Sequence, residues 1–221
     1  MNMTTTRTYR ILIVDDHPIV QEGYTQLIDR QKGLEVCGIA SDADSAMQHV
    51  TKQCPDLALV DLSLKESSGL DLIHRIKSRC PQVQILVVST YDESLFAERV
   101  LSAGAMGYIN KQEATDQLID AIHTVLNGRV FLSSQMTDCM LQRAAGNLNS
   151  LGQSPEQILS DREFEVFELI GRGLAIREVA ARLHLSSKTV ERYRENIKEK
   201  LHVKSATDLV RRATQWVLEN T

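Results

Sequence analysis

The sequence lacks the features that mark membrane and secreted proteins. None of its apolar runs in 221 residues approaches the roughly 18 that a membrane-spanning helix requires. The segment Met1–Tyr9 is polar and rich in threonine, without the hydrophobic core of a secretion signal. We therefore expect a cytoplasmic protein that makes no contact with a membrane.

Cysteine is scarce and irregularly placed. The four cysteines, Cys37, Cys54, Cys80 and Cys139, show no C-x-x-C spacing, which disfavours a zinc site or a thioredoxin-like redox motif. We expect four reduced thiols in a cytosolic protein rather than a disulfide framework.

Charge is unevenly distributed along the chain. Residues 1–128 carry 11 Lys/Arg against 17 Asp/Glu, whereas residues 155–221 carry 12 against 11. The C-terminal part is thus only weakly basic, and charge alone does not identify a nucleic-acid-binding protein.

Short apolar runs, separated by segments of helix length, each end in polar residues. This pattern predicts parallel strands of an α/β sheet, whose ligands bind at the carboxyl ends of the strands. The runs and the residues that follow them are Ile11–Val14 with Asp15 and Asp16, Leu57–Val60 with Asp61, Ile85–Val88 with Ser89, and Tyr108–Asn110 with Lys111.

Three carboxylates at one edge of a sheet repel one another unless a cation lies among them. Mg²⁺ answers this requirement because it takes oxygen ligands in octahedral geometry and retains several waters. With a hydroxyl and an ammonium nearby, the set suits magnesium together with a phosphoryl group. We expect the adjacent His17 to be a loop residue, with Pro18 opening a helix.

Over residues 9–128, the order Asp-Asp, Asp, Ser and Tyr-x-x-Lys resembles the receiver domain of two-component response regulators. The resemblance implies a doubly wound, flavodoxin-like domain with a five-stranded parallel sheet. It also implies the following roles: Asp61 as phosphoacceptor, Asp16 as a direct Mg²⁺ ligand, Asp15 as a ligand through water, the Ser63 backbone carbonyl as a third ligand, Ser89 and Lys111 as partners of the phosphoryl group, and Tyr108 as a switch residue. Lys65 departs from the pattern, since proline is common there.

A boundary follows this first domain. A helix that starts near Thr115 ends at Asn127-Gly128, a pair that terminates helices. Ser134–Ala145 predicts another helix, and residues 146–155 are rich in turn formers without apolar periodicity. We expect residues 129–158 to be a linker that contains one helix.

The rest of the chain predicts only helices. Ser160 and Glu163 form a capping box, and a weaker Asp-containing version starts at Ser205. Between them, two helices joined by a tight turn at His184–Ser186 suggest a helix-turn-helix motif, whose second helix runs from Ser187 to about Leu201.

Residues 159–221 closely resemble the LuxR-type DNA-binding domain, a small all-α four-helix module. The strings that carry the resemblance include Leu159-Ser160-x-Arg162-Glu163, Glu178-Val179-Ala180, Thr189-Val190 and Lys200-Leu201. A receiver followed by this domain is similar to response regulators of the NarL/FixJ class.

The second helix of the motif has an apolar side and a charged side. Val190, Tyr193 and Ile197 recur at helical spacing on one side, while Lys188 and Arg192 lie opposite. The resemblance implies contact with double-stranded DNA by Lys188, Thr189, Glu191, Arg192, Arg194 and Lys198. Glu191 either accepts from cytosine N4 or pairs with a cation such as Arg194. Without the resemblance, a solvated face with salt bridges is the simpler interpretation.

The last helix carries a wide apolar set, Trp216, Val217 and Leu218. An exposed aromatic with aliphatic neighbours suits a dimer seam, and the family commonly pairs through this helix. The alternative is that Trp216 fills the core of the four-helix domain.

Together these features predict a cytoplasmic bacterial transcription regulator rather than an enzyme. A histidine kinase would supply the phosphoryl group with Mg²⁺ present, and phosphorylation would favour a homodimer on DNA. The alternative is a constitutive DNA-binding protein whose receiver serves only for dimerisation. A phosphatase or hydrolase is disfavoured because Ser63 stands where a second catalytic acid would be needed.

Overall fold

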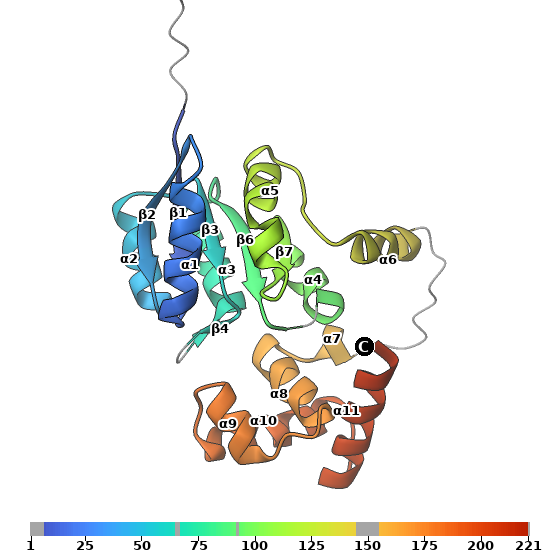
Figure 1. Cartoon of the computed structure of the whole chain (residues 1–221). Helices are drawn as coiled ribbons and strands as arrows, with labels where there is room; N and C mark the ends of the chain where they lie inside the picture. The colour runs from blue at the N-terminus through green and yellow to red at the C-terminus, as the bar shows by residue number, and fades with distance from the viewer. Residues whose placement is uncertain (1–6, 65–66, 92, 145–154, 221) are drawn as a thin grey trace, which may run out of the picture. The chain divides into compact units, whose positions relative to one another are not determined.

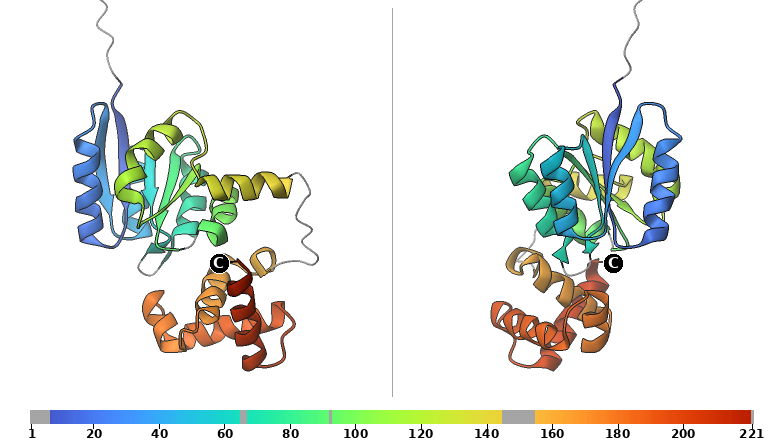
Figure 2. Two further views of the ribbon diagram at one scale, coloured as in Figure 1. Left: turned by 45° about the vertical axis from the view of Figure 1, so that its right-hand side comes forward. Right: turned by 90° about the vertical axis from the view of Figure 1, so that its left-hand side faces the viewer.

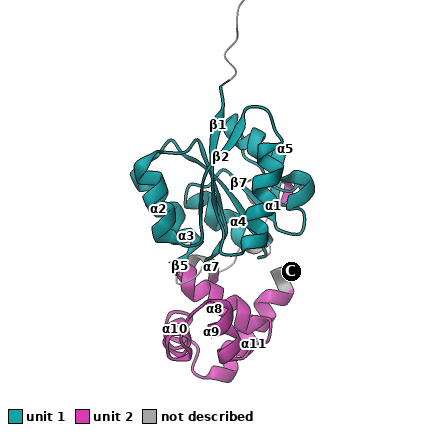
Figure 3. Ribbon diagram, turned by 60° about the vertical axis from the view of Figure 1, so that its left-hand side comes forward, with its two compact units in different colours: residues 1–137 teal, residues 138–221 magenta. Residues whose placement is uncertain are grey.

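The computed structural model describes residues 7–64, 67–91, 93–144 and 155–220 (Figure 1). The chain divides into two compact units, residues 1–137 and 138–221 (Figure 3), and each is described by itself. Within the described ranges, no helix has both the length and the apolar character needed to cross a bilayer. Lys65 and residues 145–154 of the predicted linker lie outside these ranges.

A five-stranded parallel sheet forms the centre of unit 1 (Figures 1 and 2). Its strand order is β2-β1-β3-β6-β7, which confirms the doubly wound α/β fold. The strands are β1 (Tyr9–Val14), β2 (Leu34–Ala40), β3 (Leu57–Val60), β6 (Gln84–Ser89) and β7 (Gly107–Asn110). The edge strand β2 has no continuous apolar run, so the sequence pattern alone did not reveal it.

Helices cover both faces of this sheet (Figure 2). Tyr24 and Ile28 of α1 share one apolar core with Leu118 and Ile122 of α5 and with alternate strand residues such as Ile13. The opposite layer holds α2, α3 and α4, which pack side by side. The bounds are α1 (Pro18–Asp29), α2 (Ala43–Lys52), α3 (Gly69–Arg79), α4 (Glu93–Ser102) and α5 (Ala114–Leu126).

A small antiparallel hairpin, β4 (Ser63–Leu64) and β5 (Ser67–Ser68), lies between β3 and α3. It returns the chain so that Gly69 lies against the backbone of Asp61. A Cβ atom at Gly69 would fall 2.3 Å from the Asp61 carbonyl oxygen. Glycine is therefore required here, because any side chain would push α3 away from Asp61.

Two of the four cysteines are joined. Cys54 and Cys80 form a disulfide with Cα atoms 6.5 Å apart, while Cys37 and Cys139 are free and half-buried. The expectation of four reduced thiols was therefore wrong in this structure. Cys54 precedes β3 and Cys80 follows α3, so the return of α3 across the sheet brings together two residues separated by 26 positions.

The predicted helix after the first domain is confirmed as α6 (Ser134–Ala144), and the boundary between the units falls within it. Unit 2 continues with helices only, which confirms its all-α class. These are α7 (Pro155–Ile158), α8 (Asp161–Gly171), α9 (Ile176–Arg182), α10 (Ser187–Lys200) and α11 (Ala206–Asn220).

The predicted caps of unit 2 are present. Glu163 Oε2 accepts from the Ser160 backbone N–H at 2.9 Å, and it also lies 2.6 Å from Lys200 Nζ. At the start of α11, the Ser205 hydroxyl accepts from the backbone N–H of Asp208 at 3.0 Å. The first cap thus also ties the start of α8 to the end of α10.

Aromatic rings form the core of unit 2. Trp216 is 7% exposed and meets Phe164 and Phe167 edge to face, at centroid distances of 5.1 and 5.9 Å. The expectation of an exposed tryptophan was wrong, since Trp216 fills the core. Leu218 is 78% exposed and Val217 is half-buried, so the exposed part of the predicted seam is centred on Leu218.

Candidate functional site

The carboxyl edge of the sheet brings the predicted residues of unit 1 together. Val14 and Val60, the last residues of β1 and β3, pair with each other, and Val60 pairs with Val87, two residues before the end of β6. Asp15, Asp16, Asp61 and Ser89 are all buried there. Buried carboxylates need partners, so this edge is chemically specialised rather than an ordinary set of turns.

Lys111 joins two of the carboxylates. Its Nζ lies 2.7 Å from Asp61 Oδ2 and 2.7 Å from Asp15 Oδ2. Its position after β7 lets it reach across the end of β6, because the Lys111 backbone N–H donates to the Ser89 carbonyl at 2.8 Å. The predicted ammonium therefore lies among the acids.

The electrostatics of the pair follow from burial. Burial raises the pKa of the Asp61 carboxyl above its ordinary value, although the Lys111 charge opposes this. Burial acts to lower the pKa of Lys111, but the carboxylates of Asp61 and Asp15 outweigh it and raise that pKa overall. The site has fewer positive than negative charges, and a bound cation would neutralise the excess negative charge.

The acids have the geometry of a cation site. Asp15, Asp16, His17 and Asp61 each offer one ligand atom, and these atoms all lie within 4.8 Å of one another. Hard carboxylate oxygens dominate this set, which suits Mg²⁺. The Ser63 backbone N–H donates to Asp61 Oδ1 at 3.2 Å, and the ligand role of the Ser63 carbonyl stays a prediction.

The sequence interpretation left His17 out of this cluster. His17 Nδ1 lies 2.8 Å from Asp16 Oδ1 and 3.0 Å from Asp15 Oδ1, although the imidazole is 61% exposed. Its backbone N–H also donates to Asp15 Oδ1 at 2.8 Å. The sequence feature that could have placed His17 in the cluster was its position directly after the two acids, at the N-cap of α1.

A short hydrogen-bonded path leads from Ser89 to the predicted switch residue Tyr108. The Ser89 hydroxyl accepts from the Tyr91 backbone N–H at 3.3 Å, and the Tyr91 carbonyl accepts from the Tyr108 hydroxyl at 2.8 Å. Asn110 Nδ2 donates to the same carbonyl at 3.3 Å. Tyr108 is buried, so its ring is fixed between β7 and the segment that follows Ser89.

In unit 2, the predicted recognition helix is α10. Val190 and Ile197 are buried, while Lys188, Glu191 and Arg192 are exposed. Of the other predicted DNA contacts, Thr189, Arg194 and Lys198 are half-buried. The side of α10 that carries Lys188 and Arg192 is therefore open to solvent, whereas Thr189, Arg194 and Lys198 are partly covered.

Several of the charged residues on α10 have local partners. The Arg192 guanidinium lies 5.8 Å from the ring centroid of Tyr193, and Lys198 Nζ lies 2.7 Å from Glu195 Oε2. Within the described ranges, Glu191 forms no ion pair with Arg194. Glu191 thus remains available for a base or a water at the exposed surface.

Comparison with known families matches both units. Residues 11–123 match the family described as response regulator receiver domain, and residues 157–213 match bacterial regulatory proteins of the luxR family. The oxygen regulatory protein NreC of Staphylococcus carnosus is 36% identical over 205 residues, which cover 91% of this chain and 94% of that protein. NreC of Staphylococcus aureus is 35% identical over 205 residues, which again cover 91% of this chain and 94% of that protein.

Solved structures resemble the chain in the same way. A LuxR-family two-component response regulator from Aurantimonas sp. SI85-9A1 is 34% identical with a TM-score of 0.58, covering 62% of this chain and 99% of that chain. RcsB from Salmonella enterica serovar Typhimurium, solved on promoter rprA with the phosphomimetic BeF3−, is 25% identical with a TM-score of 0.62. That match covers 94% of this chain and 99% of that chain.

Proposed function

Because the chain belongs to the family of two-component response regulators that join a receiver domain to a LuxR-type DNA-binding domain, we propose that Asp61 accepts a phosphoryl group from a histidine kinase. The family regulates transcription and is not a family of enzymes. The observation that carries the proposal is the ammonium of Lys111, held 2.7 Å from both Asp61 and Asp15 in a buried acidic site.

The transfer uses groups that are already in position. An Asp61 carboxylate oxygen attacks phosphorus, a new P–O bond forms, and the P–N bond of the phosphohistidine donor breaks. Lys111 then pairs with the phosphoryl oxygens. Asp16, Asp61 and the Ser63 carbonyl would hold Mg²⁺, with Asp15 acting through water, and when bound Mg²⁺ supplies positive charge to the phosphoryl oxygens.

Phosphorylation would act on Tyr108 through Ser89. Aspartyl phosphate adds charge and acceptor oxygens at the end of β3. The Ser89 side chain would turn so that its hydroxyl donates to one of these oxygens, and this rotation would move Oγ away from the Tyr91 N–H. Because the Tyr91 carbonyl accepts from Tyr108, the shift changes the packing of Tyr108 and favours a second conformation of the receiver.

The output is binding of double-stranded DNA by α10. The exposed residues Lys188 and Arg192 suit guanine edges or phosphates in the major groove. Glu191 would accept a hydrogen bond from cytosine N4. Contacts near the phosphate backbone of the DNA would come from Thr189, Arg194 and Lys198. The structure of RcsB on a promoter supports this use of the domain in a relative that is 25% identical.

Paired binding would follow phosphorylation. A single helix-turn-helix module offers a small interface, so symmetric pairs on half-sites about one helical turn apart give a stronger complex. The exposed Leu218, with Val217 beside it on α11, would form the seam. Such a regulator would act in the cytoplasm, where its kinase partner and DNA are available.

The test measures phosphorylation and DNA binding on the same sample. Treatment with acetyl phosphate and Mg²⁺ should add the mass of one phosphoryl group to the intact chain. The treated protein should also sediment as a larger species and bind paired half-sites more tightly than the untreated protein. If phosphoryl uptake occurs and neither property changes, the chain is a constitutive DNA-binding protein, which is the alternative function.

A further inference from the structure

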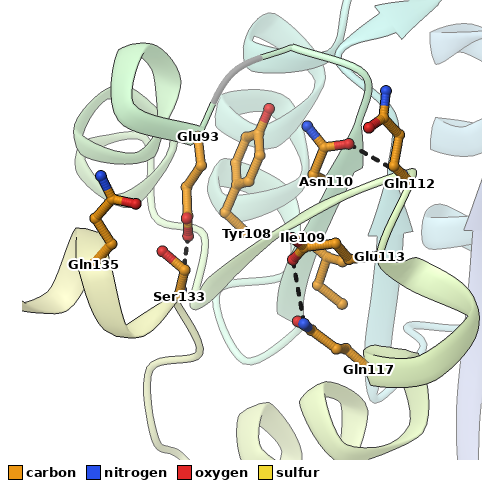
Figure 4. Close-up of a pocket in the computed structure, with 9 residues that line it drawn as sticks. All are labelled: Glu93, Tyr108, Ile109, Asn110, Gln112, Glu113, Gln117, Ser133 and Gln135. Carbon is orange, nitrogen blue, oxygen red and sulfur yellow. Dashed lines mark hydrogen bonds between the residues drawn. The ribbon is translucent and has the colours of Figure 1, made fainter. Parts of the chain in front are cut away.

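A pocket of about 230 Å³ lies beside β7, where three segments of unit 1 meet (Figure 4). Glu93 comes from the start of α4, Glu113 from the loop before α5, and Ser133 from the residue before α6. Tyr108 belongs to its lining as well. The pocket therefore marks a junction between the predicted switch residue and the helix that leads toward the DNA-binding unit.

Ser133 anchors the start of α6 to α4. Its backbone N–H donates to Glu93 Oε1 at 2.9 Å, as the dashed line in Figure 4 shows. Its hydroxyl accepts from the Met136 N–H at 3.1 Å, and its carbonyl accepts from the Thr137 N–H at 3.0 Å. Ser133 is thus the N-cap of α6, and Glu93 fixes the position of that cap.

Glu93 also lies close along the chain to the phosphate-sensing hydroxyl. Only a few residues separate it from Ser89, and Tyr91 between them contacts Ser89 through its N–H and Tyr108 through its carbonyl. Tyr91 stacks on Phe96 of α4 with ring centroids 4.8 Å apart. Movement of Tyr91 therefore reaches the first turns of α4 directly.

We propose that the hydrogen bond between Glu93 and Ser133 is a latch that holds the start of α6 while Asp61 is unphosphorylated. The proposal rests on the function proposed above. When the Ser89 hydroxyl turns to the phosphoryl group, Tyr91 and the start of α4 shift, and Glu93 releases the Ser133 N–H. The first turn of α6 then gains freedom, and α6 is the segment through which the chain passes to the DNA-binding unit.

The latch predicts a measurable change in the exchange of amide hydrogens. A hydrogen bond to a carboxylate is stronger than one between neutral groups, so its loss should speed exchange in the first turn of α6 roughly tenfold. The amides of Met136 and Thr137 report on this turn, since both bond to Ser133. Amides of α5 serve as an internal reference in the same sample.

The experiment compares the full chain with two matched variants, each with and without acetyl phosphate and Mg²⁺. Glu93→Ala removes the latch. Glu113→Ala removes a carboxylate from the same pocket, but the Glu113 side chain accepts from Gln117 Nε2 at 3.2 Å, on α5 rather than on α6. Glu93→Gln keeps an oxygen acceptor without the charge. Because this side chain is not shortened, the variant also shows whether truncation at position 93 has a general effect on α4.

Without phosphodonor, Glu93→Ala should show the fast exchange in the first turn of α6, Glu93→Gln an intermediate rate, and Glu113→Ala the wild-type rate. Phosphorylation should bring the wild type to the rate of Glu93→Ala and change that variant little. The ratio of DNA affinities with and without phosphorylation should also fall in Glu93→Ala and stay unchanged in Glu113→Ala.

Two results would overturn the latch. One is wild-type exchange in the first turn of α6 in unphosphorylated Glu93→Ala, since the contact then does not hold the start of α6. The other is unchanged exchange in wild-type protein whose mass shows complete phosphorylation, since phosphorylation then does not open the contact. Absence of phosphoryl uptake contradicts the proposed function instead, while the comparison of unphosphorylated variants still tests the contact itself.

Discussion

The two units place the charges assigned to their function in opposite environments. In unit 1 the carboxylates of Asp15 and Asp61 are buried at the edge of the sheet, and Lys111 lies between them. In unit 2 the charges assigned to function, Lys188 and Arg192, are exposed on α10, whereas its buried carboxylates, Glu163, Glu165 and Glu168, belong to α8 and each pair with a cation. Buried charges are strongly coupled, whereas exposed charges act nearly independently and are screened by salt.

This difference has a consequence for substitutions. A change in unit 1 should alter reactivity, stability and pH dependence together, because the groups share one buried site. A change on α10 should alter DNA binding with little effect on folding. The predictions below test that contrast, beginning with the largest expected effect.

Asp61→Asn should abolish phosphoryl incorporation, because the nearly isosteric amide cannot accept the group. The fold should remain intact. Burial raises the pKa of the Asp61 carboxyl, so the folded protein binds this proton more tightly than the unfolded chain does, and this group makes wild-type stability fall as pH rises above the ordinary carboxyl range. The variant should lose that contribution. Intact mass after acetyl phosphate treatment and thermal melts across pH measure both effects, and phosphoryl uptake at the wild-type rate would place the acceptor elsewhere.

Lys111→Met should destabilise unit 1 by about 3 kcal/mol, because two buried carboxylates lose their cation. The lysine contribution is fully present at neutral pH, since its raised pKa keeps it protonated there, and is lost only at alkaline pH. Mg²⁺ should restore part of the loss. Denaturant unfolding of Lys111→Met, of Asp61→Asn and of the variant with both changes gives the coupling free energy between the two side chains. Additive effects would show that the two groups are not paired.

Arg192→Ala should weaken specific DNA binding by roughly 1–3 kcal/mol if the guanidinium reads a base, with relaxed preference at one position. If it contacts phosphate, binding should weaken for all sequences and the salt slope should drop by about one unit. Folding should not change, because Arg192 is exposed. Titrations at several salt concentrations distinguish these cases, and unchanged operator affinity would assign Arg192 to a solvated face.

Leu218→Asp should change the stability of unit 2 by less than about 0.5 kcal/mol, since Leu218 is largely exposed. It should nevertheless reduce cooperative binding to paired half-sites. Trp216→Ala is the contrasting variant, because removing a core indole should cost about 3–5 kcal/mol. Sedimentation with operator DNA measures pairing, and full cooperativity in Leu218→Asp would exclude α11 as the seam.

Local pattern alone predicted most of the receiver site. Asp61, Ser89 and Lys111 were found because each follows a short apolar run, and the ends of parallel strands lie at one edge of a sheet. The caps at Ser160 and Ser205 were equally predictable, since their partners lie three residues away. Strand β2 was missed because its apolar residues do not form a continuous run.

Contacts between residues distant in sequence were decided by the tertiary structure. The disulfide of Cys54 and Cys80 depends on how α3 returns across the sheet, and the burial of Trp216 depends on how α11 packs against α8. The bond from Ser133 to Glu93 joins residues 40 positions apart. Sequence periodicity specifies which face of an element is apolar and where it ends, because those depend on neighbouring residues. It does not specify which distant element packs on that face, because many arrangements bury the same apolar surface.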